Sequence, residues 1–538
     1  MSGASPSLRF RIALILYAAA MVAFAAVGNL RLGNDCYQHF VHGVLPLRSG
    51  AWASLVLDVW NKPLVGLLYG IPGLAGYEAA RLAAVACTLL AVVWTARAGR
   101  AWVGSERGLW AGLLFGCLLP VLKDGFVPMT EIPAAAALAG ATLAHIRGRP
   151  IAAAIGLGLL PLLRTELVAM SAVLGVVLAW GDLRTGRLAR VLGLAVIVAG
   201  PTAFWLGAGA WLSQDWGWFS RQSYAELRSF ELSGLLAYNA VTRIARAVPS
   251  PMLVLLIWGS LRLARERPRG GAWIVAGTLV HLALISLVDV YPAGDGPVPD
   301  GHAVAAVNDR GFTPSGPFLA LTALYGGLGP RSRTANWVAA FVAFALVLFA
   351  FGLRPDALLP ALLVGMTAVA SERIRTASQA GAWAGLALAG ALAVRPLFFY
   401  PFRFQERSAL AVRALADAVL DAESRPRMVI QDLASGLAAD PRVLALPAPP
   451  SVEWTWPSSY PNALLSAAEG FEPAWVLFVL DGEGRLDPRY PDEVRARFET
   501  CPEVASYASE DHEGWVAMMD AISRRNRKVA WRACRVDP

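Results

Sequence analysis

Long apolar segments recur along the first 400 residues, and they constrain this chain more than any other feature. A helix needs roughly 20 apolar residues to cross a bilayer. Segments that reach or approach this length predict 13 membrane spans, at 10–29, 79–96, 108–122, 130–146, 150–163, 166–180, 191–212, 249–263, 272–289, 313–329, 336–353, 357–371 and 381–399. Only 16% of the 538 residues are charged, whereas a soluble protein has about 25%. The sequence therefore predicts a polytopic α-helical membrane protein.

Arginines indicate how the spans are oriented. They gather in every second connection between the predicted spans, beginning before the first: Arg9 and Arg11, Arg97 to Arg107, Arg147 and Arg149, Arg184 to Arg190, Arg262 to Arg269, Arg331 and Arg333, Arg373 and Arg375. Connections rich in basic residues stay on the cytoplasmic side. The N-terminus is therefore expected in the cytoplasm, and an odd number of spans places the C-terminus outside. The net charge of +8 is expected to set the topology of the chain and to contact anionic lipid headgroups. Nucleic acid is not expected as a partner, because no soluble region carries a basic and aromatic stripe.

The stretch 150–180 allows two interpretations. It holds about 30 mostly apolar residues, interrupted by Arg164, Thr165 and Glu166. One long span would put the flanking arginine-rich connections on opposite sides of the membrane. Two short spans with a hinge at 164–166 keep both connections cytoplasmic, and this interpretation is favoured. It places Arg164 and Glu166 at the outer face.

The composition changes near residue 400, and two domains are expected. Residues 1–400 form the membrane domain, and residues 401–538 form a small α/β domain outside the cytoplasm. Its run AWVLFVL is too short to span and predicts a buried strand. In an oxidising compartment Cys501 and Cys534 would be able to form a disulfide.

Polar residues concentrate on the outer side, above all in the first outer loop at 30–78. This loop contains the run RLGNDCYQHFVHGVLPLRSGAWASLVLDVWNKPLVGLLY. Asp35 is a candidate catalytic base, with a helix N-cap or a solvated loop carboxylate as the alternative. Lys62, in WNKPL, is a candidate ligand of a lipid phosphate, with a lysine that snorkels to the interface as the alternative.

The other outer connections add further candidates. Glu131 opens a predicted span, where the helix dipole would favour it; alternatively, Asp124 and Glu131 join Asp35 around a metal or a hydroxyl acceptor. Glu166 is expected to form a salt bridge with Arg164. The histidines His39, His42 and His302 lack the spacing of a zinc site and are interpreted as loop residues. The tryptophans and tyrosines of 213–224 are expected to anchor at the interface, with stacking on a sugar as the alternative.

The order of these motifs resembles a known family. The Lys-Pro run WNKPLVGLLY, the acidic opening MTEIP and the hinge LLRTEL follow the order found in the GT-C glycosyltransferases. The resemblance is to the 13-span bacterial branch that includes protein mannosyltransferases and lipid A aminoarabinose transferase. It departs from the family at Leu64, where a second proline is usual, and at Asn61, where an acidic residue often stands.

The resemblance implies an activity and roles for particular residues. Such enzymes move a sugar from a polyprenyl-phosphate donor to a hydroxyl acceptor on a glycan, lipid or protein, with inversion, at the outer face of the bacterial cytoplasmic membrane. Asp35 would be the base, and Lys62 and Arg164 would bind the donor phosphate. Asp124 and Glu131 would position the acceptor or a divalent metal, Mg²⁺ or Mn²⁺, whose ligands the motifs do not specify.

Two other functions fit parts of the pattern. A transporter or flippase of a lipid-linked sugar would place its charges near the membrane midplane and show a repeat of broken helices. A non-catalytic scaffold would instead carry its function in the outer domain. The enzyme is favoured because the ionisable residues lie at the outer ends of spans and no repeat is found in the sequence.

Overall fold

The structure is a computed structural model of the whole chain. It describes residues 6–27, 34–59, 61–222, 244–245, 247–266, 268, 270–288, 309–328, 333–351, 362–364, 429–431, 474–480, 503–508 and 530–536. The predicted spans at 357–371 and 381–399, His302, Cys501 and the expected helices of the C-terminal domain lie outside these residues, apart from 362–364.

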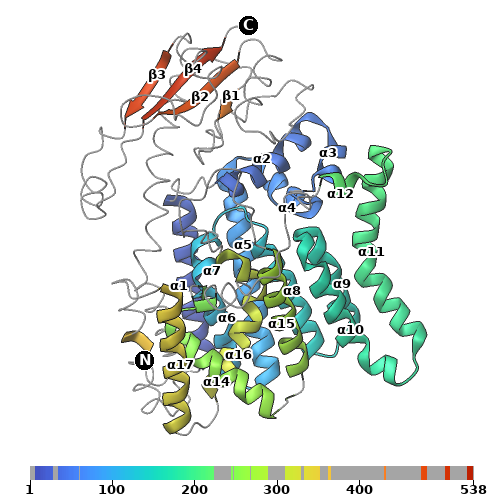
Figure 1. Cartoon of the computed structure of the whole chain (residues 1–538), viewed down its shortest axis with the longest axis vertical. Helices are drawn as coiled ribbons and strands as arrows, with labels where there is room; N and C mark the ends of the chain where they lie inside the picture. The colour runs from blue at the N-terminus through green and yellow to red at the C-terminus, as the bar shows by residue number, and fades with distance from the viewer. Residues whose placement is uncertain are drawn as a thin grey trace. The chain divides into compact units, whose positions relative to one another are not determined.

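Helices dominate the part of the chain before residue 352 (Figure 1). The α-helices are α1 Pro6–Val27, α2 Asn34–Ser49, α3 Trp52–Leu57, α4 Pro63–Gly73, α5 Tyr77–Val103, α6 Trp110–Gly116, α7 Leu119–Asp124, α8 Glu131–Ile146, α9 Pro150–Leu163, α10 Val168–Arg184, α11 Leu188–Ser213, α12 Trp218–Gln222, α14 Ser250–Glu266, α15 Gly271–Val288, α16 Gly316–Leu328 and α17 Arg333–Phe351. Three 3-10 helices join them: η1 Glu106–Leu109, η2 Thr165–Leu167 and η4 Asp309–Ser315.

The chain divides into two compact units. The first, called here the helical unit, comprises Met1–Phe24, Ala53–Leu67 and Arg81–Phe398. The second comprises Ala25–Trp52, Leu68–Ala80 and Phe399–Pro538. The segment that holds Lys62 therefore belongs to the helical unit, whereas α2, which holds Asp35, belongs to the second unit.

Close helix packing builds the helical unit. Helices α8, α9 and α10 pack side by side, α11 contacts α9 and α10, and α14 packs on α16 and α17 (Figure 1). Glycines allow the closest approaches: a Cβ on Gly259 of α14 would overlap the carbonyl oxygen of Thr322 in α16. Small residues that let backbones touch are the usual means of helix association in membranes, where apolar lipid removes the hydrophobic drive.

Prolines explain where the helices depart from the predicted spans. The segment predicted at 108–122 is broken into α6 and α7, and Pro120 is the second residue of α7. Proline lacks the N–H that continues a helix, but it fits the first turn of a new one. The start of the span predicted at 313–329 is likewise the 3-10 helix η4, with Pro317 as the second residue of α16.

The hinge predicted at 164–166 is confirmed. Helix α9 ends at Leu163, η2 covers Thr165–Leu167, and α10 begins at Val168. Among the described residues, three helices are long and apolar enough to cross a membrane: Tyr77–Val103, Thr165–Arg184 and Leu188–Ser213. Five shorter apolar helices accompany them, so the total of 13 spans stays a prediction.

The second unit has a helical part and a sheet, which are described separately. In the helical part, α2 packs on α4 so tightly that a Cβ on Gly70 would meet the backbone of Gly43. The hydroxyl of Tyr77 donates to the Cys36 sulfur at 3.6 Å, and its ring meets Phe40 edge-on. The predicted loop 30–78 is thus largely helical.

The sheet lies in the C-terminal region and has the order β1-β2-β4-β3. Its strands are β1 Val429–Gln431, β2 Ala474–Leu480, β3 Glu503–Ala508 and β4 Ala530–Val536. Strand β1 is parallel to β2, whereas β4 is antiparallel to both β2 and β3, with Leu477 opposite Ala533. The run AWVLFVL forms β2, as its length and composition predict.

Candidate functional site

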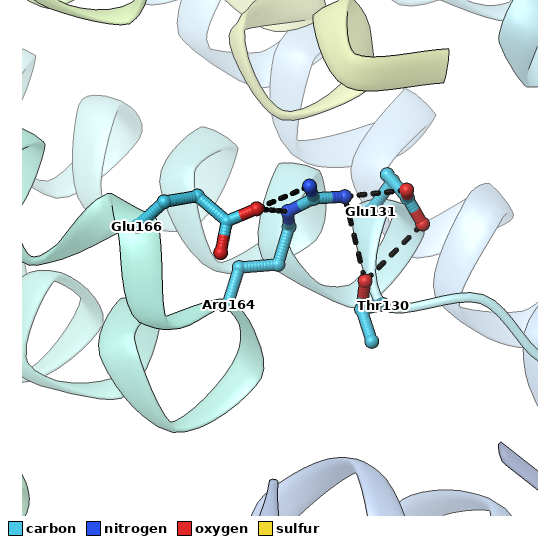
Figure 2. Close-up of polar contacts among 4 residues, drawn as sticks. All are labelled: Thr130, Glu131, Arg164 and Glu166. Carbon is cyan, nitrogen blue, oxygen red and sulfur yellow. Dashed lines mark hydrogen bonds and ion pairs between the residues drawn. The ribbon is translucent and has the colours of Figure 1, made fainter. Parts of the chain in front are cut away.

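A partly buried cluster of charged groups lies where α8 begins and α9 ends (Figure 2). It consists of Thr130, Glu131, Arg164 and Glu166, and is called here the Arg164 cluster. The guanidinium lies between the two carboxylates and forms ion pairs with both. Its Nε donates to Glu166 Oε1 at 2.8 Å, and its Nη1 donates to Thr130 Oγ1 at 3.5 Å. The salt bridge expected between Arg164 and Glu166 is confirmed, and Glu131 is a second partner.

Local backbone structure places these side chains. Arg164 has an extended backbone, with φ −150° and ψ 116°, and its N–H donates to Leu160 O at 2.8 Å to close α9. Its carbonyl accepts from Leu167 N at 3.0 Å, so η2 turns Glu166 back toward the guanidinium. Glu131 is the first residue of α8, where the positive end of the helix dipole stabilises a carboxylate. The side chain of Glu131 is only 5% exposed, which makes a cationic partner necessary.

Lys62 belongs to the same electrostatic environment. Burial lowers the pKa of its ammonium, the charges of Glu166, Asp58 and Glu131 oppose that shift, and the charge of Arg164 adds to it. The lysine has a left-handed backbone with φ 60°, a region that residues other than glycine seldom adopt. A turn fixes this conformation: Asn61 N donates to Asp58 Oδ1 at 2.8 Å, and Lys62 N donates to Asp58 O at 3.1 Å. Asp58 therefore shapes the turn that presents Lys62.

An aromatic cluster supports the segment that leads to Lys62. Trp205 of α11 donates its Nε1–H to the carbonyl of Val56 in α3 at 2.7 Å. Val59, Trp205 and Trp218 are buried together, and Phe219 packs against them. Trp218 is therefore a core residue of the helical unit, which corrects the prediction of an interfacial anchor. Trp216 is 90% exposed and remains available for that role.

The structure places the remaining candidates as follows. Asp35 is the second residue of α2, and its side chain is outside what the structure describes. Asp124 ends α7 and is buried. His39 and His42 lie within α2, and His39 is buried, so the interpretation as loop histidines is wrong for both. These helical positions follow from α2 continuing through the predicted loop.

His281 is a residue that the sequence analysis missed. It lies in α15, is buried, and is affected by the charges of Arg164 and Glu166. The available signal was a single ionisable residue within an apolar span, because such residues are expensive in a membrane and usually functional.

The described carboxylates do not form a metal site. Within the residues covered by the structure, no group of three or more His, Cys, Asp or Glu side chains is arranged to hold a metal ion. Glu131 and Glu166 instead bind Arg164.

Comparison with solved structures identifies the class of fold. The chain has a GT-C fold, as the order of its motifs implied, and three of its described helices are long and apolar enough to cross a membrane. The particular structures that it resembles are two of ArnT, the lipid A aminoarabinose transferase, from Cupriavidus metallidurans.

Both likenesses extend over nearly the whole chain. The ArnT structure bound to undecaprenyl phosphate gives a TM-score of 0.62 at 15% identity, covering 96% of this chain and 97% of that one. The apo ArnT structure gives 0.58 at 15% identity and covers 97% of both chains. No protein-family model matches the chain, and no curated protein matches its sequence.

Proposed function

We propose that this protein is a membrane glycosyltransferase that takes a sugar from an undecaprenyl-phosphate donor and passes it to a hydroxyl acceptor with inversion. The observation that carries the proposal is the whole-chain likeness to ArnT, one of whose structures contains undecaprenyl phosphate. The partly buried cations Lys62 and Arg164 supply chemistry that fits a phosphate. The reaction would occur at the outer face of the bacterial cytoplasmic membrane, with the N-terminus inside and the C-terminal domain outside.

The leaving group explains why cations are needed. In the donor, the phosphate joins the lipid to the sugar and carries one negative charge. When the bond from the anomeric carbon to the phosphate oxygen breaks, the leaving phosphate keeps the electron pair and gains a second charge. Cations already fixed next to that oxygen stabilise the transition state more than the ground state. Lys62 is assigned to this role because the charges of Glu166, Arg164 and Glu131 act on its ammonium.

Arg164 is assigned as the second phosphate ligand. Its guanidinium is already bound to Glu131, Glu166 and Thr130, so a phosphate must join or replace one of these contacts. Glu166 is the carboxylate better placed to move, because its side chain is 22% exposed, whereas that of Glu131 is 5% exposed and needs a cationic partner. Glu131 would stay beside the guanidinium, where it and Asp124 are proposed to position the acceptor.

Asp35 is proposed as the base. It would remove the proton from the acceptor hydroxyl as the oxygen attacks the anomeric carbon from the face opposite the phosphate. A positioned carboxylate typically contributes about 10²- to 10⁴-fold to such a step.

The test is transfer from radiolabelled undecaprenyl-phosphate monosaccharides in membranes that contain the protein. Asp35→Asn should abolish transfer, while Asp182→Asn should not. Asp182 is a matched control because its carboxylate binds Arg187 and Arg190 at the end of α10, within an arginine-rich connection. Lys62→Ala should reduce donor binding. Full transfer by Asp35→Asn would remove Asp35 from the mechanism, and absence of transfer by the wild type with all donors would refute the proposed function.

A further inference from the structure

Two buried polar groups near the Arg164 cluster have no hydrogen-bond partner within the described part of the chain. They are Nδ1 of His281 in α15 and Oγ1 of Thr313 in η4. His281 is 3% exposed and Thr313 is 1% exposed. More than nine in ten buried polar groups in proteins find a partner, so two exceptions on neighbouring elements require an explanation.

The two residues lie on elements that contact each other. Helix α15 contacts η4, and the ring of Phe312, the residue before Thr313, meets the His281 imidazole with centroids 6.4 Å apart at 65°. The 3-10 helix η4 also packs on α8, the helix that Glu131 opens.

The charged cluster lies within electrostatic reach of the same place. Both Arg164 and Glu166 act on the His281 imidazole. Helix α15 contacts α10, whose chain continues directly from η2 and Glu166. His281 therefore lies within electrostatic range of Arg164, and Thr313 lies on an element that packs on α8, the helix that Glu131 opens.

Three hydroxyl groups on neighbouring elements do find partners within the bundle. Thr142 donates to Leu138 O at 2.7 Å and accepts from Trp273 Nε1 at 3.1 Å. Ser171 donates to Leu157 O at 2.8 Å. Ser315, two residues after Thr313, donates to Phe312 O at 3.1 Å. The groups at 281 and 313 differ because, among the described residues, neither has a hydrogen-bond partner.

We propose that His281 and Thr313 form the subsite that binds hydroxyl groups of the donor sugar, and so help to select which sugar is transferred. This inference rests on the proposed function. A hydroxyl and an imidazole nitrogen are the kind of group that pairs with the hydroxyls of a neutral sugar, whereas Lys62 and Arg164 suit the phosphate. The two parts of the donor would thus bind to different groups. The phosphate would bind to the cations, and the sugar would bind to His281 and Thr313.

The experiment compares binding of undecaprenyl phosphate with binding of undecaprenyl-phosphate sugars, using full-length protein in lipid nanodiscs. The sugars are a neutral hexose, a pentose and an N-acetylhexosamine, and the tightest of them is used further. Thr313→Val keeps the size of the side chain and removes the hydroxyl, and His281→Phe keeps an aromatic ring and removes both nitrogens. Each should weaken binding of that donor by about fivefold to tenfold, the value of one hydrogen bond, and leave binding of undecaprenyl phosphate unchanged.

Thermal unfolding without ligand separates this role from a structural one. Replacing a polar group that has no partner should leave the melting temperature unchanged or raise it. The matched control is Thr142→Val, a buried threonine with both hydrogen bonds made. This variant should lower the melting temperature. It should weaken the binding of both ligands equally, or leave the binding of both unchanged.

Three results would overturn the inference. One is that Thr313→Val and His281→Phe weaken the binding of undecaprenyl phosphate and of its sugar derivative by the same factor, or weaken the binding of neither. Another is a fall in the melting temperature of both variants, which would show that a structural water binds the two groups. The third is that no sugar improves binding over undecaprenyl phosphate. Absence of all binding, including that of undecaprenyl phosphate, would instead refute the proposed function on which the inference rests.

Discussion

Removing the guanidinium of the Arg164 cluster should destabilise the protein through its two carboxylates. Breaking a fully buried ion pair costs roughly 3–5 kcal/mol, whereas an exposed pair is worth about 0–1 kcal/mol. The side chains of Arg164 and Glu166 are 19% and 22% exposed, but that of Glu131 is only 5% exposed. Solvent screening therefore reduces mainly the contribution of the ion pair between Arg164 and Glu166 to stability. We expect Arg164→Met to lower the free energy of unfolding by about 2–4 kcal/mol.

A double-mutant cycle tests which carboxylate matters. In the Arg164→Met background, Glu131→Gln removes a buried charge that has lost its cation, so it should recover part of the lost stability. We expect a coupling energy of about 2 kcal/mol for Arg164 with Glu131 and about 1 kcal/mol for Arg164 with Glu166. The assay is unfolding by sodium dodecyl sulfate in mixed micelles, followed by tryptophan fluorescence.

The pair Arg262 and Glu266 is the matched control. It joins the same two side-chain types, but Glu266 is 42% exposed. Its coupling should stay below about 1 kcal/mol. The reasoning would be refuted if Arg164 and Glu131 coupled no more strongly than this control pair, or if Glu166 coupled more strongly than Glu131.

Three further predictions concern other parts of the helical unit. Because burial lowers the pKa of Lys62 from its ordinary value of 10.5, binding of undecaprenyl phosphate should weaken as the pH rises, before it reaches that value. Lys62→Arg should keep binding there, and an equal alkaline loss in both proteins would contradict the prediction. Gly259→Ala should prevent close packing of α14 and abolish folded yield by size-exclusion chromatography. Gly193→Ala, where a Cβ meets nothing, should be neutral or stabilising by about 0.5–1 kcal/mol, and equal yields of the two variants would disprove the packing argument. Trp205→Phe should cost roughly 1–3 kcal/mol in the same micelle assay, because the Val56 carbonyl loses its donor, and an unchanged unfolding curve would rule this out.

The hinge at 164–166 illustrates what sequence reasoning can reach. Its position followed from the flanking arginines, which must stay on one side of the membrane, and its salt bridge followed from the spacing of Arg164 and Glu166. The pairing with Glu131 was not predicted, because it joins residues far apart in the chain whose proximity depends on how α8 packs on α9.

Other features needed three-dimensional information. The left-handed backbone of Lys62 has no signal in the residue type, because lysine is not among the residues that favour this region. His281 and Thr313 are candidates because each has a buried polar atom without a hydrogen-bond partner among the described residues. This depends on how the helices pack, which the sequence does not reveal. The helices of the predicted loop were missed because the loop was judged by its polarity, and a helix at a membrane surface is polar as well.

The left-handed turn at Lys62 also bears on how this position tolerates substitution. Glycine and asparagine adopt such a backbone at the least cost, yet neither can hold a phosphate by charge. Arginine keeps the charge and pays the same conformational penalty as lysine. Under the proposed phosphate-binding role, position 62 therefore needs both a left-handed backbone and a positive charge. No single residue type meets both requirements well. A library of all substitutions, sorted once for folded yield and once for lipid-phosphate binding, should return two sets of residues with little overlap.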